Sequence, residues 1–120
     1  MRTMTQAARA YGTAATHRSQ REQEADVFRY TNGSLKVARD ANPISRLRAL
    51  ADNRRLWRTV SDLMSDPESE LPVELRASIL SVGLAVQREM DQERPNFDFL
   101  IGVNQNMAEG LSTMPERAGT

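Results

Sequence analysis

Apolar residues recur every three to four positions along four segments of this chain, and prolines stand between those segments. This spacing places the apolar residues on one face of an α-helix, whereas a strand would require alternation, which no segment shows. Pro43, Pro67, Pro72 and Pro95 mark helix starts or ends, because proline lacks a backbone N–H and restricts the residue before it. The sequence therefore predicts an all-α fold, a small antiparallel bundle of four main helices with short loops.

The chain divides into three predicted parts. Residues 1–18 are rich in Ala and Thr without sustained periodicity, which predicts a flexible N-terminal arm. Residues 19–111 form the helical domain, and residues 112–120, with Pro115 and Gly119, form a C-terminal tail. Within the domain, Ser19-Gln20-Arg21-Glu22 forms a capping box, and Asn42 and Asn96 are suited to cap later helices. The expected helices cover 19 to about 41, about 43–65, about 72–93 and 96 to about 111.

The apolar stripes predict which residues face the core. The first stripe is Val27, Phe28, Thr31, Leu35 and Ala38, and the second is Leu47, Leu50, Ala51, Trp57, Val60 and Met64. The third is Leu75, Ile79, Val82, Gly83, Val86 and Met90, and the fourth is Phe97, Leu100, Ile101, Asn104, Met107, Ala108 and Leu111. Gly83 lies on an inner stripe, which suggests the close approach of another helix, while Asn32-Gly33 is expected to weaken the first helix.

Charge is balanced over the chain but not along it. The 16 basic and 16 acidic residues divide into 12 and 5 in residues 1–58, a difference of +7, and 4 and 11 in residues 59–120, a difference of −7. A basic half can bind nucleic acid. Alternatively, basic and acidic helices pack side by side and form ion pairs along their edges. The second interpretation is favoured, because the sequence contains no long run of basic residues.

The residue types that catalysis or metal binding needs are scarce. His17 is the one histidine, it falls in the arm, and there is no cysteine. Glu89 and Glu93 lie one turn apart among arginines, which is typical of a solvated helix face. We therefore expect no enzyme activity, no cofactor and no metal site. No apolar run approaches the roughly 20 residues that span a bilayer, and no signal peptide is evident, so the expected location is cytoplasmic.

Some apolar residues fall outside the predicted inner stripes. Leu80, Leu84, Phe99 and Val103 form strips of this kind, and such strips often mark a groove into which a partner helix docks. With Trp57 and Arg54 at the edge, these residues are the predicted partner-binding site. A homodimer would bury the same strips equally well. Asn104 either hydrogen-bonds across the bundle and fixes helix register or contacts a partner.

Several blocks of sequence are distinctive when taken together. The most specific are Asn53-Arg54-Arg55-Leu56-Trp57, Asp66-Pro67 and Leu71-Pro72-Val73-Glu74-Leu75-Arg76-Ala77-Ser78-Ile79. The others are Ile101-Gly102-Val103-Asn104-Gln105-Asn106-Met107-Ala108-Glu109-Gly110-Leu111, Ala10-Tyr11-Gly12 and Ser19-Gln20-Arg21-Glu22-Gln23-Glu24-Ala25. These blocks resemble those of the flagellar biosynthesis regulator FlaF family of alphaproteobacteria, and the likeness covers roughly residues 8–111. Gln20, where the family has proline, and Asn32-Gly33 depart from its pattern.

The resemblance implies a non-enzymatic cytoplasmic protein that binds flagellin as a secretion chaperone and acts alongside the flagellin translational repressor FlbT. The terminal segments of flagellin are amphipathic helices that are unpaired before polymerisation, so a bundle with spare apolar strips suits them. The alternative is regulation through the flagellin mRNA leader, alone or with FlbT. Arg48, Arg55 and Arg58 group on the polar side of the second helix, and RNA held by arginines would bind in a strongly salt-dependent manner.

Overall fold

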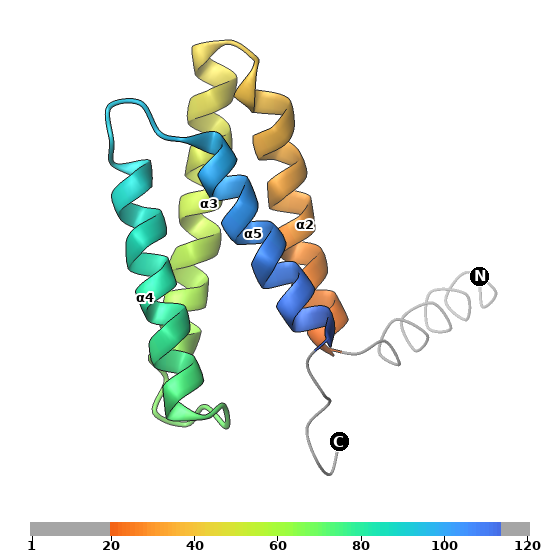
Figure 1. Ribbon diagram of the computed structural model, residues 1–120, viewed down its shortest axis with the longest axis vertical. Helices are drawn as coiled ribbons and strands as arrows, with labels where there is room; N and C mark the ends of the chain where they lie inside the picture. Colours follow the sequence, from red (N-terminus) through yellow and green to blue (C-terminus); the bar gives the residue numbers. More distant parts are fainter. Residues whose placement is uncertain (1–19, 114–120) are drawn as a thin grey trace, which may run out of the picture.

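The computed structural model describes residues 20–113, and the four predicted helices are present there (Figure 1). They are α2 (Gln20–Arg39), α3 (Pro43–Met64), α4 (Val73–Met90) and α5 (Phe97–Thr113), and no strand occurs between residues 20 and 113. Figure 1 shows each helix running antiparallel to the one before it, which confirms the predicted all-α bundle. The predicted arm, with His17, and residues 114–120 of the predicted tail lie outside the described residues.

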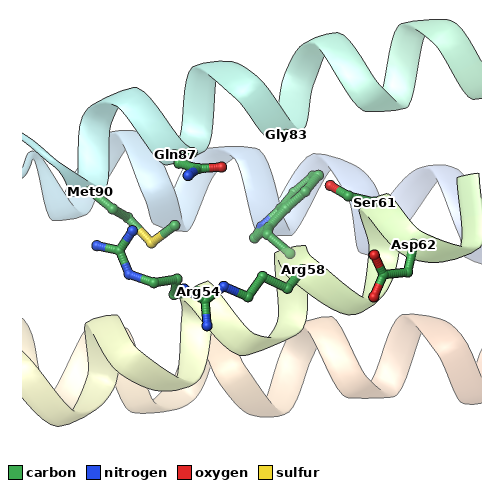
Figure 2. Close-up of a pocket in the computed structure, with 8 residues that line it drawn as sticks. Arg54, Arg58, Ser61, Asp62, Gly83, Gln87 and Met90 are labelled. Carbon is green, nitrogen blue, oxygen red and sulfur yellow. The ribbon is translucent and has the colours of Figure 1, made fainter. Parts of the chain in front are cut away.

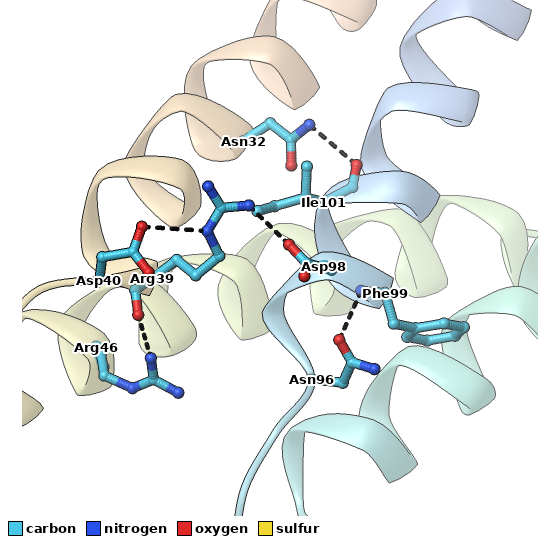
Figure 3. Close-up of polar contacts among 8 residues, drawn as sticks. All are labelled: Asn32, Arg39, Asp40, Arg46, Asn96, Asp98, Phe99 and Ile101. Carbon is cyan, nitrogen blue, oxygen red and sulfur yellow. Dashed lines mark hydrogen bonds and ion pairs between the residues drawn. The ribbon is translucent and has the colours of Figure 1, made fainter.

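Two asparagines begin helices as expected. Asn42 Oδ1 accepts a hydrogen bond from the Ser45 backbone N–H at 2.9 Å, and Pro43 follows as the first helical residue. Asn96 Oδ1 accepts from the Phe99 backbone N–H at 3.1 Å at the start of α5 (Figure 3). In both cases the side chain satisfies a backbone donor that has no partner within its own helix.

Three helix ends differ from the predicted ones. α2 ends at Arg39 instead of near residue 41, because the backbone tightens and the Ala41 N–H donates to the Ala38 carbonyl at 3.0 Å. α4 ends at Met90 instead of near residue 93, and residues 91–96 turn the chain into α5. α5 continues through Ser112 to Thr113, so these two residues belong to the helix and not to the tail.

The helices do not pack equally against one another. α5 lies mainly against α2, whereas α4 lies mainly against α3 and contacts α5 much less. The buried core is formed by residues from all four helices: Ala25, Phe28, Leu35, Ala38, Ala49, Leu50, Trp57, Val60, Val86, Met90, Phe97, Leu100, Ile101, Ala108 and Leu111. Most residues of the predicted stripes are among them, so the helical periodicity identified the core-facing sides.

Three residues of the predicted stripes are wrongly placed in the core. Val27 is 52% exposed and Leu47 is 66% exposed, and Ala51 is also exposed. For Val27 the reason lies in the packing of α2. α2 turns the side that carries Asn32 toward α5, where the Asn32 side-chain amide donates to the Ile101 carbonyl at 3.0 Å. Within residues 20–113, nothing covers the opposite side of α2.

Gly83 is a point of close approach between α4 and α3, as its place on the inner stripe suggested. A Cβ atom at this position would lie 3.3 Å from Trp57 Cε3 and 3.3 Å from Ser61 Oγ. These contacts are tighter than ordinary van der Waals distances, so the absence of a side chain lets the α4 backbone rest against the indole.

We expect Gly83→Val to lower the free energy of unfolding by about 1–3 kcal/mol, because the added methyl groups press against Trp57. The matched control is Gly102→Ala in α5, where a Cβ would meet nothing within 4 Å. That variant should be more stable than the parent by about 0.5–1 kcal/mol through helix propensity alone. Urea unfolding followed by circular dichroism measures both. Equal stabilisation by the two substitutions would contradict the close packing.

Ion pairs between helices join the basic half of the chain to the acidic half. Arg39 Nη1 lies 2.7 Å from Asp98 Oδ1, which connects α2 to α5 (Figure 3), and Arg54 Nη1 lies 2.9 Å from Asp91 Oδ1 at the end of α4. The hydrogen bond to Asp98, with the nearby charge of Asp40, raises the pKa of Arg39 above its ordinary value. Packing of oppositely charged helices is thus the interpretation of the charge asymmetry that these contacts support.

Candidate functional site

A chain of hydrogen bonds crosses the interior and joins α3, α4 and α5. The Trp57 indole Nε1–H donates to Asn104 Oδ1 at 2.9 Å, and Asn104 Nδ2 donates to Asn53 Oδ1 at 2.7 Å. Asn53 Nδ2 lies 3.3 Å from Met90 Sδ. Asn104 is 1% exposed, so of its two possible roles the hydrogen bond across the bundle is confirmed. A direct contact between Asn104 and a partner is excluded in this fold.

Arg54 and Trp57 both line a hollow of about 200 Å³ between α3 and α4. Figure 2 shows Arg54 at this hollow. Its lining residues are Arg54, Trp57, Arg58, Ser61, Asp62, Gly83, Gln87 and Met90. Arg54 is half-buried and its guanidinium pairs with Asp91. Trp57 is 3% exposed and packs its ring edge-to-face against Phe28, with centroids 5.7 Å apart. Its expected place at the edge of a docking surface is therefore corrected to the bundle interior.

Leu80 and Leu84 lie on the flank of α4 that carries this hollow. Leu84 is followed at helical spacing by Gln87, which lines the hollow, and by Asp91, which pairs with Arg54. Leu80 precedes Leu84 by one turn. Leu84 is 57% exposed and Leu80 is half-buried. These two leucines form a short apolar strip on the outer surface of α4.

Phe99 and Val103 lie elsewhere. Val103 is half-buried and packs against the hydrophobic core from α5, and Phe99, one turn earlier, is 39% exposed. On α4, Val82 also packs against this core. Leu84 follows Val82 by two residues, which places it nearly on the opposite side of the helix. The predicted site residues therefore belong to separate surfaces and do not line one groove.

A further uncovered surface lies between α2 and α3. Two adjoining hollows of about 570 and 430 Å³ share the residues Tyr30, Ser34 and Asp52. Together they form the α2–α3 groove, lined by Val27, Tyr30, Thr31, Gly33, Ser34, Val37, Ala38, Ser45, Arg48, Ala49, Asp52, Arg55, Leu56 and Thr59. The groove is on the side of α2 turned away from α5, since Tyr30 precedes the α5-facing Asn32 by two residues.

An apolar stripe runs along the α2 wall of this groove. Val27, Tyr30, Ser34 and Val37 follow one another at intervals of three, four and three residues. Val27 is 52%, Tyr30 81% and Val37 79% exposed. Sequence reasoning missed this site because it assigned Val27 to the inner stripe with Phe28. The signal that could have revealed it is a second helical stripe, offset from the first by one residue.

The α3 wall of the groove carries charge. Arg48, Asp52 and Arg55 line it, and within residues 20–113 none of their side chains forms an ion pair or hydrogen bond. All three are exposed. The groove thus combines an apolar wall on α2 with a net positive wall on α3, an arrangement that can hold an amphipathic segment with acidic flanking residues.

Residues 20–113 contain no group of three or more His, Cys, Asp or Glu residues arranged to hold a metal ion. None of α2 to α5 is both long and apolar enough to cross a lipid bilayer.

Comparison with known proteins identifies the family. The family model described as "Flagellar protein FlaF" matches residues 7–111, which include α2, α3, α4 and most of α5. No curated protein and no solved structure matches the chain. The match covers the blocks that carry the sequence resemblance, from Ala10-Tyr11-Gly12 to Leu111. The chain therefore belongs to the flagellar protein FlaF family.

Proposed function

We propose that this FlaF-family protein binds flagellin in the cytoplasm as a secretion chaperone and thereby supports flagellin synthesis and export, without catalysing a reaction. The observation that carries the proposal is the α2–α3 groove, which leaves Val27, Tyr30 and Val37 exposed along three turns of one helix. An exposed apolar stripe of this length is typical of a surface that another helix covers.

The chemistry of the guest supports this function. The terminal segments of flagellin are amphipathic helices, and before polymerisation their apolar faces have no partner. A helix laid along the groove would cover the apolar faces of both partners. Burying one large apolar side chain stabilises a complex by about 1.5–3 kcal/mol before the costs of association. Val27, Tyr30 and Val37 would therefore be central to the affinity.

The experiment is a titration of purified protein with monomeric flagellin by isothermal calorimetry. Val37→Asp, which places a carboxylate in the groove, is expected to weaken binding by about 10–100-fold. Leu84→Asp and Phe99→Asp test the two surfaces first suggested by the sequence. All three positions are exposed, so the variants should fold, which circular dichroism verifies.

The outcomes show separately whether the protein binds flagellin and which of its surfaces does so. Loss of binding with Val37→Asp alone assigns flagellin to the groove. Loss with Leu84→Asp or Phe99→Asp alone returns the site to one of the strips predicted from the sequence. No binding of flagellin to the parent protein at concentrations of about 100 μM would exclude the proposed function. Co-purification with flagellin from a secretion-blocked strain provides the corresponding test in cells.

A second candidate is regulation of flagellin synthesis through the mRNA leader, directly or with FlbT. The observation that favours it is Tyr30, whose ring is exposed in the same groove that Arg48 and Arg55 line. Aromatic rings and arginines together can hold single-stranded RNA. RNA binding is the second candidate because the α2 wall also exposes Val27 and Val37. Nucleic acid would offer these two side chains no apolar contacts. Leader RNA included in the same titration distinguishes the two candidates.

A further inference from the structure

We propose that the α2–α3 groove selects an amphipathic helix whose flank carries two carboxylates one heptad apart, seated against Arg48 and Arg55. The inference rests on the proposed function in one respect, since it names the part of a protein guest that the groove accepts. It goes beyond that function by specifying the charge pattern of the guest and the wall of the groove that binds the charged residues.

The α2 wall fixes the shape of the guest. Val27, Tyr30 and Val37 are apolar, and Ser34 lies between the last two. These four positions follow one another at intervals of three, four and three residues, which is the spacing of a helix–helix seam, in which side chains of one helix fit between those of another. Val27 and Val37 lie ten residues apart, which corresponds to about 15 Å along a helix axis. The groove therefore matches three turns of a guest helix.

Small residues line part of the larger of the two hollows. Gly33 and Ser34 on α2 face Ser45 and Ala49 on α3 across the hollow. A Cβ atom at Gly33 would meet nothing within 4 Å, so the space above it is open. Small residues at a seam let the backbone of a second helix approach closely, and large guest side chains such as Leu can then fill the hollow.

The α3 wall fixes the charge of the guest. Arg48 and Arg55 are seven residues apart, so their guanidinium groups arise from points about 10.5 Å apart along the same side of α3. Asp52 lies between them, and within residues 20–113 none of the three has an ionic partner. Two carboxylates of a guest helix at the same spacing complement the two arginines, whereas lysines there would be repelled.

The charge pattern also argues against a second copy of this chain as the occupant. The lining of the groove contains two basic residues, Arg48 and Arg55, and one acidic residue, Asp52. Two grooves placed face to face would bring net positive walls together. A partner with acidic residues on one flank avoids this repulsion, so the groove suits a different protein.

The test uses two designed helical peptides that differ only in charge. Both carry Leu at intervals of three, four and three residues and a fluorescent label. One has Glu at two flanking positions seven residues apart, and the other has Lys there. Fluorescence anisotropy measures their binding to the full-length protein at low ionic strength, where exposed charges interact most strongly. We expect the Glu peptide to bind about tenfold or more tightly than the Lys peptide.

A charge-reversed protein provides the matched control. In the double variant Arg48→Glu and Arg55→Glu, the preference should invert, so that the Lys peptide binds more tightly than the Glu peptide. Leu84→Asp, on the outer surface of α4, should leave both affinities unchanged. Equal affinity of the two peptides for the parent protein would overturn the inference, and so would an unchanged preference in the double variant.

Two further measurements recognise the other possible occupants of the groove. A dimer in analytical ultracentrifugation that Val37→Asp dissociates would assign the groove to a second copy and overturn the inference. If polyuridine RNA displaces the Glu peptide from the parent protein, and the double variant no longer binds this RNA, the groove binds nucleic acid. That result would also overturn the inference.

Failure of the inference and failure of the proposed function are distinguishable. Flagellin binding that persists in both Val37→Asp and the double variant keeps the proposed function but removes the groove as its site. Peptide selectivity that inverts as expected, together with no binding of flagellin, keeps the acidic-helix groove and rejects flagellin as its guest.

Discussion

Replacing Trp57 by Ala is expected to lower the free energy of unfolding by about 3–5 kcal/mol. Trp57 is 3% exposed, packs edge-to-face against Phe28 and lies where a Cβ atom at Gly83 would come within 3.3 Å of its ring. Its removal would create a cavity where α4 meets α3 and would also leave Asn104 Oδ1 without its indole donor. The total stability of a domain is about 5–15 kcal/mol, so this one substitution would remove a large part of it.

Two control variants divide the effect of Trp57 into packing and hydrogen bonding. Trp57→Phe keeps an aromatic ring but loses the N–H, so it should cost less than Trp57→Ala. Leu47→Ala removes an apolar side chain that is 66% exposed and should change stability by less than about 0.5 kcal/mol. Because Trp57 is the one tryptophan of the chain, urea unfolding must be followed by circular dichroism. A loss below about 1 kcal/mol for Trp57→Ala would contradict its placement in the core.

The second large effect is expected for Asn104→Leu, which should lower the free energy of unfolding by about 2–4 kcal/mol. Leu matches Asn roughly in size, but it can neither accept from Trp57 Nε1 nor donate to Asn53 Oδ1. Both groups would then be buried without a partner. A buried polar group in that state keeps the full cost of leaving water. Tryptophan fluorescence during urea unfolding provides the measurement.

A double-mutant cycle tests whether Asn104 acts through Trp57. Trp57→Phe in the parent protein removes a satisfied hydrogen bond, whereas in the Asn104→Leu background it removes an indole N–H that already lacks its partner. The substitution should therefore cost at least about 1 kcal/mol less in that background. Additive effects of the two substitutions would show that the hydrogen bond does not contribute to stability. Circular dichroism again follows unfolding, since the fluorophore is absent from half of the cycle.

Much of the fold could be predicted because it depends on local features. Asn42 followed by Pro43 specifies where α3 begins, and the observed cap involves only Ser45, three residues away. Gly83 on an inner stripe indicated close packing, and the indole of Trp57 is what packs there. An asparagine in the middle of an apolar stripe left two roles open, a hydrogen bond across the bundle or a partner contact, and Asn104 makes two hydrogen bonds across the bundle.

The candidate site was predicted less well. Leu84 and Phe99 are exposed, whereas Val103 packs against the core. Together with Leu80, these residues lie on two different helices and do not share one groove. The α2–α3 groove was missed, although Tyr30 is the most exposed large hydrophobic residue of those described. In each case the sequence contains the apolar residues, but it does not show which helix packs beside them.

The sequence by itself determined the four helices, the apolar side of each and the family to which the chain belongs. Only the tertiary structure decided which apolar side is covered by another helix and which is left open. The physical reason is that periodicity along one helix reports the direction of its side chains, but not the position of its neighbours. α5 settles against α2 and α4 against α3, and this choice leaves Val27, Tyr30 and Val37 exposed while it encloses Trp57 and Asn104.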